Sequence, residues 1–448
     1  MSPAALTPAR ISPLRMLIRV IRNPLEALPA AAFHAPLVHT EVLGRQRFHV
    51  MDPFLIQEAL VGNGDALAKG PELRRSVGSA LGEGLLTANG AHWKWQRQSA
   101  SPIFRHERLL AYLPAMLGVA SATRDRWLAL SDGTEIDIGH EMMHTTFDII
   151  VETMMSKRAA VDIAKTERAV TDYLEATGWL FALSLLNAPD WIPFPGKARA
   201  NAAGRYLRDS IGGIAAARRS AGSTSGDLID MLLAASDPET GRAMTDDEIT
   251  DNLLTFIAAG HETTALGLAW TFDLLSRHPE HAERALTEIE TVTGGATLEP
   301  AHIGQLTYTR QVFQEAMRLY PPAPIIARVT TKPFTLADRA VPVGSMIYVP
   351  IYAIHRHSAL WDRPEEFDPD RFAPELSKAR HRYAYMPFGG GPRVCIGSGF
   401  AMLEGVALLA TLLRGVRLTS VAGEPPKPRM RLTLRPGTPL MMRVERRS

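Results

Sequence analysis

The sequence has few of the features of a disulfide-stabilised, nucleic-acid-binding or membrane-spanning protein. Cys395 is the only cysteine among 448 residues, which excludes an intramolecular disulfide or an all-cysteine zinc site and fits a reducing compartment. With 49 Lys and Arg against 47 Asp and Glu, the formal charge is only +2, too small for a nucleic-acid-binding surface. The longest stretch without a charged residue, Ala340 to His355, contains Pro342 and Pro350 and cannot form a spanning helix. We therefore expect a soluble, cytoplasmic protein.

Helical periodicity predicts a mainly α fold with a minor β region. Apolar residues recur at i, i+3, i+4 and i+7 through most segments between about Pro53 and Arg318. The runs Val341 to Ile354 and Arg429 to Val444 have the composition of short strands. No repeat and no long polar linker divides the chain. We expect one domain over residues 31–448, preceded by an extension or short helix over residues 1–30.

The N-terminal segment is basic, and a targeting peptide has to be considered. Four arginines precede the first acidic residue, Glu26; they are Arg10, Arg15, Arg19 and Arg22. The segment lacks the uninterrupted apolar core and small-residue cleavage site of a secretory signal. Its apolar residues form one helical stripe, made of Leu14, Leu17, Ile18 and Ile21. A short packed or surface-lying helix is the preferred interpretation.

A long buried helix is predicted from a capping box at Thr245 and Glu248, followed by an apolar run that continues to about Ser276. In its middle lies the polar patch Ala259 to Thr264, where Gly260 weakens the helix. In isolation, the patch is explained by Thr263 bonding back to a backbone carbonyl.

The segment from Phe388 to Gly397 surrounds Cys395 with four glycines and a proline, ahead of a helical pattern. Glycines permit close approach to a flat ligand, and free N–H groups with a helix N-terminus favour a thiolate. A buried, inert thiol is the alternative. No local signature supports hydrolysis. A single thiolate is enough to ligate a haem iron, because the porphyrin supplies the equatorial nitrogens.

The cysteine segment resembles the haem-binding loop of the cytochrome P450 family. The family pattern Phe-x-x-Gly-x-Arg-x-Cys-x-Gly is matched at Phe388, Gly391, Arg393, Cys395 and Gly397. This resemblance implies the cytochrome P450 fold, with haem b between the long central helix and the cysteine loop. It also implies that Cys395 is the axial ligand of the iron, that Phe388 packs near the sulfur, and that Arg393 pairs with a haem propionate.

Further motifs of the family follow in the expected order. Glu315 and Arg318 resemble the Glu-x-x-Arg pair, which Arg371 would complete as a buried network. Trp93 and Arg97 resemble the helix that contacts a propionate, with His92 as a possible additional contact.

Arg328 lies where the family often places another propionate partner. Buried carboxylates need such charge-assisted donors.

The polar patch resembles the oxygen-activation motif of the family. Distortion of the helix at Gly260 would open a groove for oxygen and water, and Ala259 and Gly260 are expected to contact the haem. Breaking the O–O bond heterolytically requires protons, so Thr263 would supply a hydroxyl and Glu262 a relay to solvent. His261 is expected to face outward without a catalytic role.

The resemblance implies a monooxygenase that inserts one atom of dioxygen into a lipophilic substrate. The chain leaves no room for a flavin or iron–sulfur domain, so we expect electrons from a separate ferredoxin or flavodoxin with its reductase. The residues proposed for its docking are Lys94, Arg97, Arg105, Arg108, Lys378, Arg380 and Arg382.

A peroxide-driven oxygenase, a haem isomerase and a haem-based sensor are the alternatives, and the Glu262 and Thr263 pair argues against all three.

An apolar cluster lies where the family folds a mobile lid, and simple core packing is its alternative. Its residues are Trp179, Leu180, Phe181, Leu183, Leu185, Leu186, Trp191 and Phe194. Four more residues are candidates for the substrate pocket: Leu85, Leu86, Ile257 and Ile325.

Overall fold

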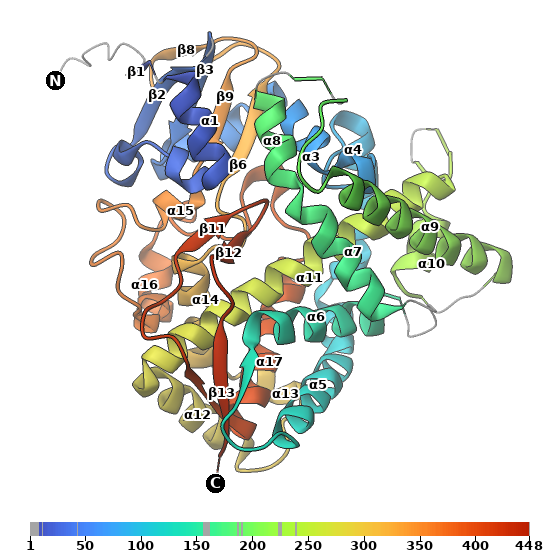
Figure 1. The fold of residues 1–448 in the computed structure, drawn as a ribbon, viewed down its shortest axis with the longest axis vertical. Coiled ribbons are helices and arrows are strands. Elements are labelled where there is room, and N and C mark those ends of the chain that lie inside the picture. Colours follow the sequence, from blue (N-terminus) through green and yellow to red (C-terminus); the bar gives the residue numbers. More distant parts are fainter. Residues whose placement is uncertain are drawn as a thin grey trace.

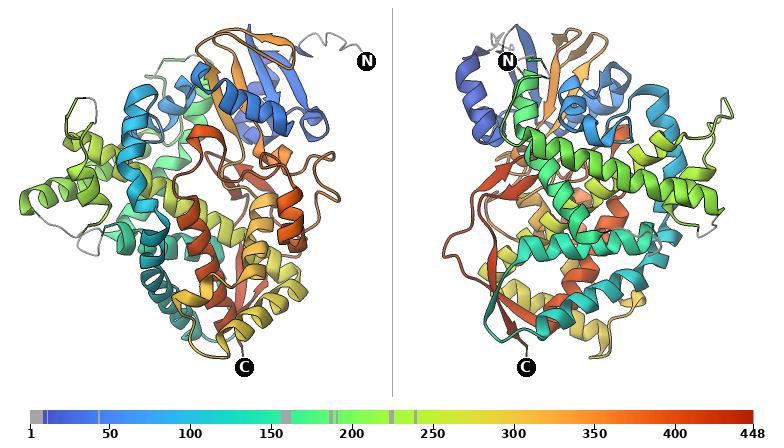
Figure 2. Two further views of the ribbon diagram at one scale, coloured as in Figure 1. Left: turned by 180° about the vertical axis from the view of Figure 1, so that it is seen from behind. Right: turned by 45° about the vertical axis from the view of Figure 1, so that its right-hand side comes forward.

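The fold is that of a computed structural model, which describes residues 9–10, 12–42, 44–155, 162–185, 188–189, 191–222, 226–237 and 240–447. Helices form most of the molecule, and the largest sheet lies at one end of it (Figure 1). The two further views in Figure 2 show the same separation between sheet and helical body. The prediction of a mainly α protein with a minor β region is confirmed.

The largest sheet combines four strands from the N-terminal part of the chain with two strands from residues 326–349. In order across the sheet, its strands are Ala9–Arg10 (β1), Leu37–Val42 (β2), Arg45–Val50 (β3), Met346–Val349 (β9), Ile326–Thr330 (β6) and Leu67–Ala68 (β4). Phe48 of β3 and Ile347 of β9 are register partners and are fully buried in one core cluster. Because side chains alternate along a strand, the neighbouring residues Arg47 and Tyr348 lie on the opposite face.

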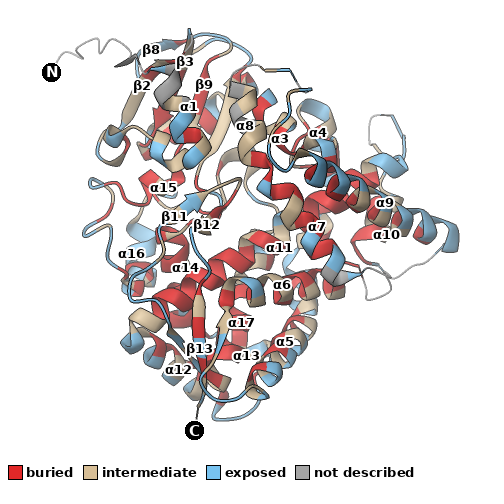
Figure 3. Ribbon diagram, viewed as in Figure 1, coloured by how far each residue is buried: buried red, intermediate tan, exposed pale blue. Residues whose placement is uncertain are grey.

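The helical body is built around α11, which spans Asp246–Arg277. The predicted capping box is present, since Glu248 N donates to Thr245 Oγ1 at 3.2 Å and Thr245 N donates to Glu248 Oε2 at 2.8 Å. Most of the helix is buried, as Figure 3 shows. The other helices of the body are α3 (Pro71–Leu81), α4 (Gly90–Ala100), α5 (His106–Leu128), α6 (Ile138–Met154), α7 (Ile163–Glu175), α8 (Thr177–Leu185), α9 (Lys197–Ala221), α12 (Pro279–Thr293), α14 (Thr307–Leu319) and α17 (Ser398–Gly415).

Short elements complete the fold. The short helices are α1 (Pro13–Arg22), α2 (Pro53–Gln57), α10 (Leu228–Ala234), α13 (Pro300–Ile303), α15 (Ile351–Ile354) and α16 (Pro374–Ala379). The remaining strands are β5 (Thr134–Asp137), β7 (Phe334–Leu336), β8 (Arg339–Val341), β10 (Val416–Ser420), β11 (Pro428–Met430), β12 (Leu434–Pro436) and β13 (Met441–Arg446). The strand prediction for 429–444 is confirmed. That for 341–354 is wrong at its end, because Ile351–Ile354 forms α15 after Pro350.

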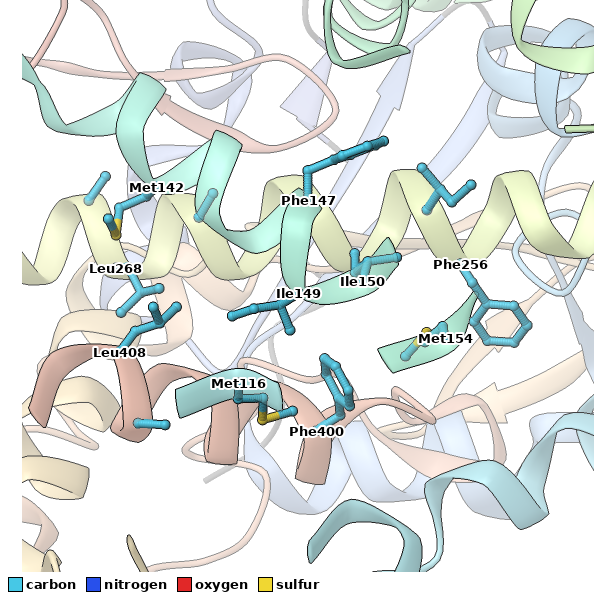
Figure 4. Close-up of a cluster of buried hydrophobic side chains, with 14 of the residues drawn as sticks. Met116, Met142, Phe147, Ile149, Ile150, Met154, Phe256, Leu268, Phe400 and Leu408 are labelled. Carbon is cyan, nitrogen blue, oxygen red and sulfur yellow. The ribbon is translucent and has the colours of Figure 1, made fainter. Parts of the chain in front are cut away.

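The main hydrophobic core lies where α11 packs against α6 and α17. Figure 4 shows Phe147 and Ile150 of α6, Leu268 of α11 and Leu408 of α17 in this core. Each is at most 1% exposed, and burial of one such side chain contributes about 1.5–3 kcal/mol to folding. The core therefore fixes α11 relative to the helix that follows Cys395.

Among the described residues, α17 alone has the length and composition of a membrane span. It packs against α5, α11, α12 and α14, and 61% of its residues are buried within the molecule. Its apolar character is that of a core helix.

The N-terminal helix predicted from the apolar stripe is present as α1. Ile18 is 57% exposed, so this member of the stripe faces solvent. Met16 and Val20 instead line the internal cavity described below.

Candidate active site

Cys395 lies in the turn that leads into α17. A single 3-10 turn, Gly391–Arg393, precedes it, and the backbone N–H of Cys395 donates to Phe388 O at 2.9 Å. Cys395 lies inside the protein, but it borders an internal cavity. Its accessible surface is therefore the surface that faces this cavity.

Burial raises the pKa of the Cys395 thiol, and the N–H of Gly397 and the charge of Arg97 offset this only in part. The loop and the helix terminus by themselves therefore do not offset the cost of burying a thiolate at this position. A metal ion that coordinates a thiol deprotonates it outright, so metal binding is the remaining source of a thiolate.

The cavity beside Cys395 has a volume of about 520 Å³ and mainly apolar walls. It brings together most of the predicted site, which comes from segments far apart in the sequence. The predicted residues that line it are Trp93, Arg97, Ala259, Gly260, Glu262, Thr263, Arg328, Phe388, Arg393, Cys395 and Gly397. Of the predicted pocket residues, Leu85, Leu86 and Ile325 line the cavity and Ile257 does not.

Four of the cationic side chains that line this cavity act on one another and have no acidic partner. They are Lys69, Arg97, Arg328 and Arg393, and none forms an ion pair with another described residue. Burial lowers the pKa of Arg328 to about 10, and burial with the charges of Arg328 and Arg97 lowers that of Arg393 to about 10. Burial and the same three arginines lower the pKa of Lys69 far below its ordinary value. The mutual repulsion of these charges favours a bound anion.

No local sequence pattern marks Lys69, so it is absent from the predicted site.

Two hydrogen bonds hold Arg393 in place. Its Nη1 donates to Ala88 O at 2.9 Å, and its Nη2 donates to Asn89 Oδ1 at 3.0 Å. Its guanidinium carbon lies 4.3 Å from the Trp93 ring centroid. Trp93 therefore orients a cation of this group.

Two predicted cofactor contacts lie elsewhere. His92 does not line the cavity, because its ring lies against Gln96, with Nε2 2.6 Å from the side-chain nitrogen, and faces Glu248. Gly391 does not line it either. Its φ of 69° and its approach to Leu60, whose carbonyl oxygen would lie 2.8 Å from an added Cβ, give it a packing role.

The polar patch of α11 lies within one continuous α-helix, which is not interrupted at Gly260. Thr263 Oγ1 donates to Ala259 O at 2.6 Å, as predicted for a structural role, yet Thr263 also lines the cavity. Gly260 allows α6 to approach closely, since an added Cβ would lie 3.0 Å from Ile150 Cδ1.

Glu262 is anchored on one side only. Its Oε1 accepts from Thr433 Oγ1 at 2.8 Å and from Nε of Arg435 at 2.5 Å. Oε2 has no hydrogen-bond partner within the part of the chain that the structure describes. Thr433 and Arg435 were missed because they lie more than 170 positions away on the β11–β12 segment.

The predicted outward orientation of His261 is wrong. The residue is 1% exposed and packs edge-on against Phe147, with both ring nitrogens unpartnered. Burial and the charge of Arg435 lower its pKa to about 3, so the ring is neutral. A helix that is buried on all sides has no outward face at this position.

The Glu315–Arg318 pair is fully buried and bidentate, with Nε–Oε2 and Nη2–Oε1 distances of 2.7 and 2.8 Å. Arg371 Nε lies 3.5 Å from Glu315 Oε1, which brings the three predicted partners together. His355 extends the network, because it lies 3.1 Å from Arg318 O and accepts from the Met386 N–H at 3.0 Å. The network thus supports the chain just before Phe388.

None of the described side chains of the predicted lid lines the cavity. Leu174, Thr177 and Gly178, which precede the predicted lid, do line it, whereas Trp191 is 77% exposed. Trp179, Leu180, Leu183 and Phe194 are half-buried and do not line the cavity. Leu186 and the side chains of Phe181 and Leu185 lie outside the described residues.

Comparisons with known proteins agree with this geometry. The family model described as cytochrome P450 matches residues 29–443. The chain belongs to the cytochrome P450 family. It is 35% identical to cyclooctatin synthase of Streptomyces melanosporofaciens, covering 95% of this chain and 92% of that protein. Pentalenene oxygenase of Streptomyces avermitilis is 32% identical, with coverage of 90% and 88%. The crystal structure of the cytochrome P450DA heme domain superposes with a TM-score of 0.81 at 27% identity, covering 92% and 90%.

Membership of the cytochrome P450 family establishes the cofactor and the reaction class. The protein binds haem b through its cysteine and is a haem-thiolate monooxygenase that uses dioxygen, a lipophilic substrate and electrons from a redox partner. Cys395 is the ligand, because the chain contains no other cysteine.

Proposed function

We propose that this monooxygenase oxidises a substrate with a mainly hydrocarbon body in the cavity between Cys395 and Thr263. The observation that carries the proposal is the apolar wall that continues from these residues to Leu85, Leu86 and Ile325. The names of two relatives contain compounds of this kind. Cyclooctat-9-en-7-ol 5-monooxygenase, 32% identical, is named after an alcohol, and pentalenene oxygenase is named after a hydrocarbon. A ligand of this kind gains binding energy from apolar surface that leaves water.

The four unpaired cations fit the cofactor. Haem b carries two propionate carboxylates, and Lys69, Arg97, Arg328 and Arg393 line one cavity with Cys395. Carboxylates beside these side chains would form charge-assisted hydrogen bonds and relieve their mutual repulsion. The bound haem supplies redox chemistry at iron, with a thiolate ligand that favours O–O cleavage. The donor set therefore fits haem b, with Lys69 added to the predicted residues.

Proton delivery is assigned to Thr263 and Glu262. Thr263 presents a hydroxyl at the cavity, and its bond to Ala259 O fixes the position of this oxygen. Glu262 is held by Arg435 and Thr433 through Oε1, which leaves Oε2 to exchange a proton with water. The pair can therefore hold and pass protons without moving the helix.

We further propose a separate ferredoxin or flavodoxin as the electron donor. Five of the predicted docking residues are exposed: Lys94, Arg105, Arg108, Lys378 and Arg382. Arg97 lines the cavity, and Arg380 lies 4.3 Å from the Trp361 ring centroid, so neither belongs to this surface. The lone cysteine and the core position of α17 favour the cytoplasm as the location of the monooxygenase itself.

One set of experiments tests the function. The reduced protein with carbon monoxide is expected to show the absorption of thiolate-ligated haem, and Cys395→Ser is expected to lose it. A spectral screen of the ferric protein against lipophilic compounds would then find substrates, whose oxidation should require the reductase chain. Product formed equally well with peroxide alone would identify a peroxide-driven enzyme. Absence of turnover with every ligand that binds would favour a sensor.

A further inference from the structure

The N-terminal helix forms part of the cavity wall, a role that the proposed function does not yet use. Five residues from α1 and the segment just after it line the cavity; they are Met16, Val20, Pro24, Ala27 and Leu28. All five are apolar, so their side chains offer no charge and no hydrogen bond to a ligand. A ligand that reaches this part of the wall therefore binds best with hydrocarbon at that end.

The cavity is separated from solvent here by the thickness of one helix. Met16 and Val20 lie one helical turn apart and both line the cavity. Val20 is only 2% exposed. Ile18 and Arg19 of the same helix are exposed. One side of α1 thus belongs to the cavity and another to the surface of the molecule.

Asn23, the C-cap of α1, ties the helix to a second part of the wall. Its Nδ2 donates to Pro428 O at 3.0 Å, and its Oδ1 accepts from the Met430 N–H at 3.0 Å. Both partners belong to β11, and Met430 lines the cavity as well. The helix also packs beside α8, whose first residues, Thr177 and Gly178, line the cavity (Figure 1). The helix therefore joins β11 and α8 into one continuous wall.

Of the two α1 residues that line the cavity, Val20 has the more rigid side chain. A β-branched side chain in a helix is restricted to one strongly preferred rotamer, so Val20 cannot turn aside for a longer ligand. Met16 has three rotatable bonds and can adapt its shape to a neighbouring group. Val20 is therefore the residue of α1 that gives the wall a fixed boundary.

We propose that Val20 limits the length of hydrocarbon that the substrate cavity accepts, and that Asn23 is the positioning residue that keeps this boundary in place. This inference rests on the proposed function and adds a residue that determines substrate size at the same site. A substrate whose hydrocarbon ends at α1 fits. Each further methylene would have to displace the Val20 side chain or the helix, and overpacking of this kind is unfavourable.

The test uses 1-alkylimidazoles, because the free ring nitrogen coordinates the haem iron and fixes one end of a ligand of known length. Dissociation constants for the ferric holoenzyme are measured by spectral titration with chains from butyl to tetradecyl. Affinity should increase about fourfold for each buried methylene, up to the chain that reaches α1, and then level off.

Val20→Ala should move this limit to a longer chain. At the first chain beyond the parental limit, the variant should bind about fourfold more tightly than the parent. Val20→Phe should move the limit to a shorter chain. Asn23→Ala should move it to a longer chain, because α1 loses both hydrogen bonds to β11. A purely structural role of Asn23 would lower stability but would leave the limit unchanged.

Ile18→Ala is the matched control, because it shortens a β-branched side chain on the exposed side of the same helix. It should keep the parental limit. Val20→Ala decides the question if Val20→Phe fails to bind haem.

Three results would overturn the role of Val20: affinity of the parent that rises through tetradecyl without levelling off, an unchanged limit in Val20→Ala, or an equal shift in Ile18→Ala. An unchanged limit in Asn23→Ala would overturn the role of Asn23. In each of these cases the ligands still bind at the iron, so the proposed function stands. Absence of any binding at the iron would overturn the proposed function and the inference with it.

Discussion

At the scale of single residues, Thr263 combines a structural hydrogen bond with a proposed role in proton delivery. Its hydroxyl bonds to Ala259 O, and Thr271 makes the same i−4 bond to Gly267 O, also at 2.6 Å, without lining the cavity. Thr263→Ala is expected to keep haem but to lower product formed per electron pair at least tenfold, with the remainder released as hydrogen peroxide. Product, peroxide and NAD(P)H consumption are measured together.

Thr271→Ala is the control for the lost backbone bond, and it should couple electrons to product normally. Thr263→Ser restores a hydroxyl and should recover most of the coupling. Coupled turnover by Thr263→Ala at the parental level would contradict the proton-delivery role.

Gly391 shows how one glycine of the cysteine loop serves packing. Gly391 and Gly226 both have a φ of 69°, but an added Cβ at 391 would lie 2.8 Å from Leu60 O, whereas none of the described atoms lies within 4 Å of one at 226. Gly226→Ala should therefore cost only the left-handed backbone strain, about 1 kcal/mol. Gly391→Ala should cost at least about 1 kcal/mol more and weaken haem retention, as measured by urea unfolding and by haem transfer to apomyoglobin. Equal costs at the two positions would refute the close approach.

At the scale of elements, the buried Glu315–Arg318 network connects α14 to the chain that precedes the cysteine loop. Glu315→Gln keeps the size of the side chain but leaves the buried charge of Arg318 without its partner. The expected loss is about 3–5 kcal/mol in the free energy of unfolding, with lower haem content. Denaturant titration of the holoenzyme measures it.

Glu135→Gln removes one partner of the exposed pair with Arg443 and serves as the control. Its cost should be below about 1 kcal/mol. A Glu315→Gln loss of the same size would show that the network does not support the loop.

The elements also show what the sequence could predict. The capping box of α11, the cysteine loop and the Glu315–Arg318 pair were recognised because their partners lie close together along the chain. Lys69, His355 and Arg435 were not recognised, because each acquires its role from a segment brought near only by folding. The orientation of His261 was predicted wrongly, because packing against Phe147 of α6 decides its environment and no local pattern reveals that contact.

At the scale of the whole molecule, buried neutral histidines make stability depend on pH. Burial lowers the pKa of His261 and His355 to about 3 and that of His49 to about 4, below the ordinary value of 6.5 in the unfolded chain. Between these values the unfolded state binds more protons, so stability is complete above about pH 6.5 and falls as the pH is lowered. Each histidine contributes up to about 1.4 kcal/mol per pH unit.

His261→Phe isolates one of these contributions, because the ring packs against Phe147 and bonds to nothing described around it. When the pH falls from 7.5 to 5, the free energy of unfolding of the variant should decrease by about 2 kcal/mol less than that of the parent. The reason is that the variant no longer has a histidine at 261 that binds a proton only in the unfolded state. Urea unfolding of the holoenzyme at a series of pH values measures this, with exposed His106→Phe as the control. Parallel pH dependence of His261→Phe and the parent would mean that His261 is protonated in the folded protein. In that case His261→Phe should also destabilise the fold at neutral pH. If His261 is neutral in the folded protein, the same substitution should change the stability at neutral pH only slightly.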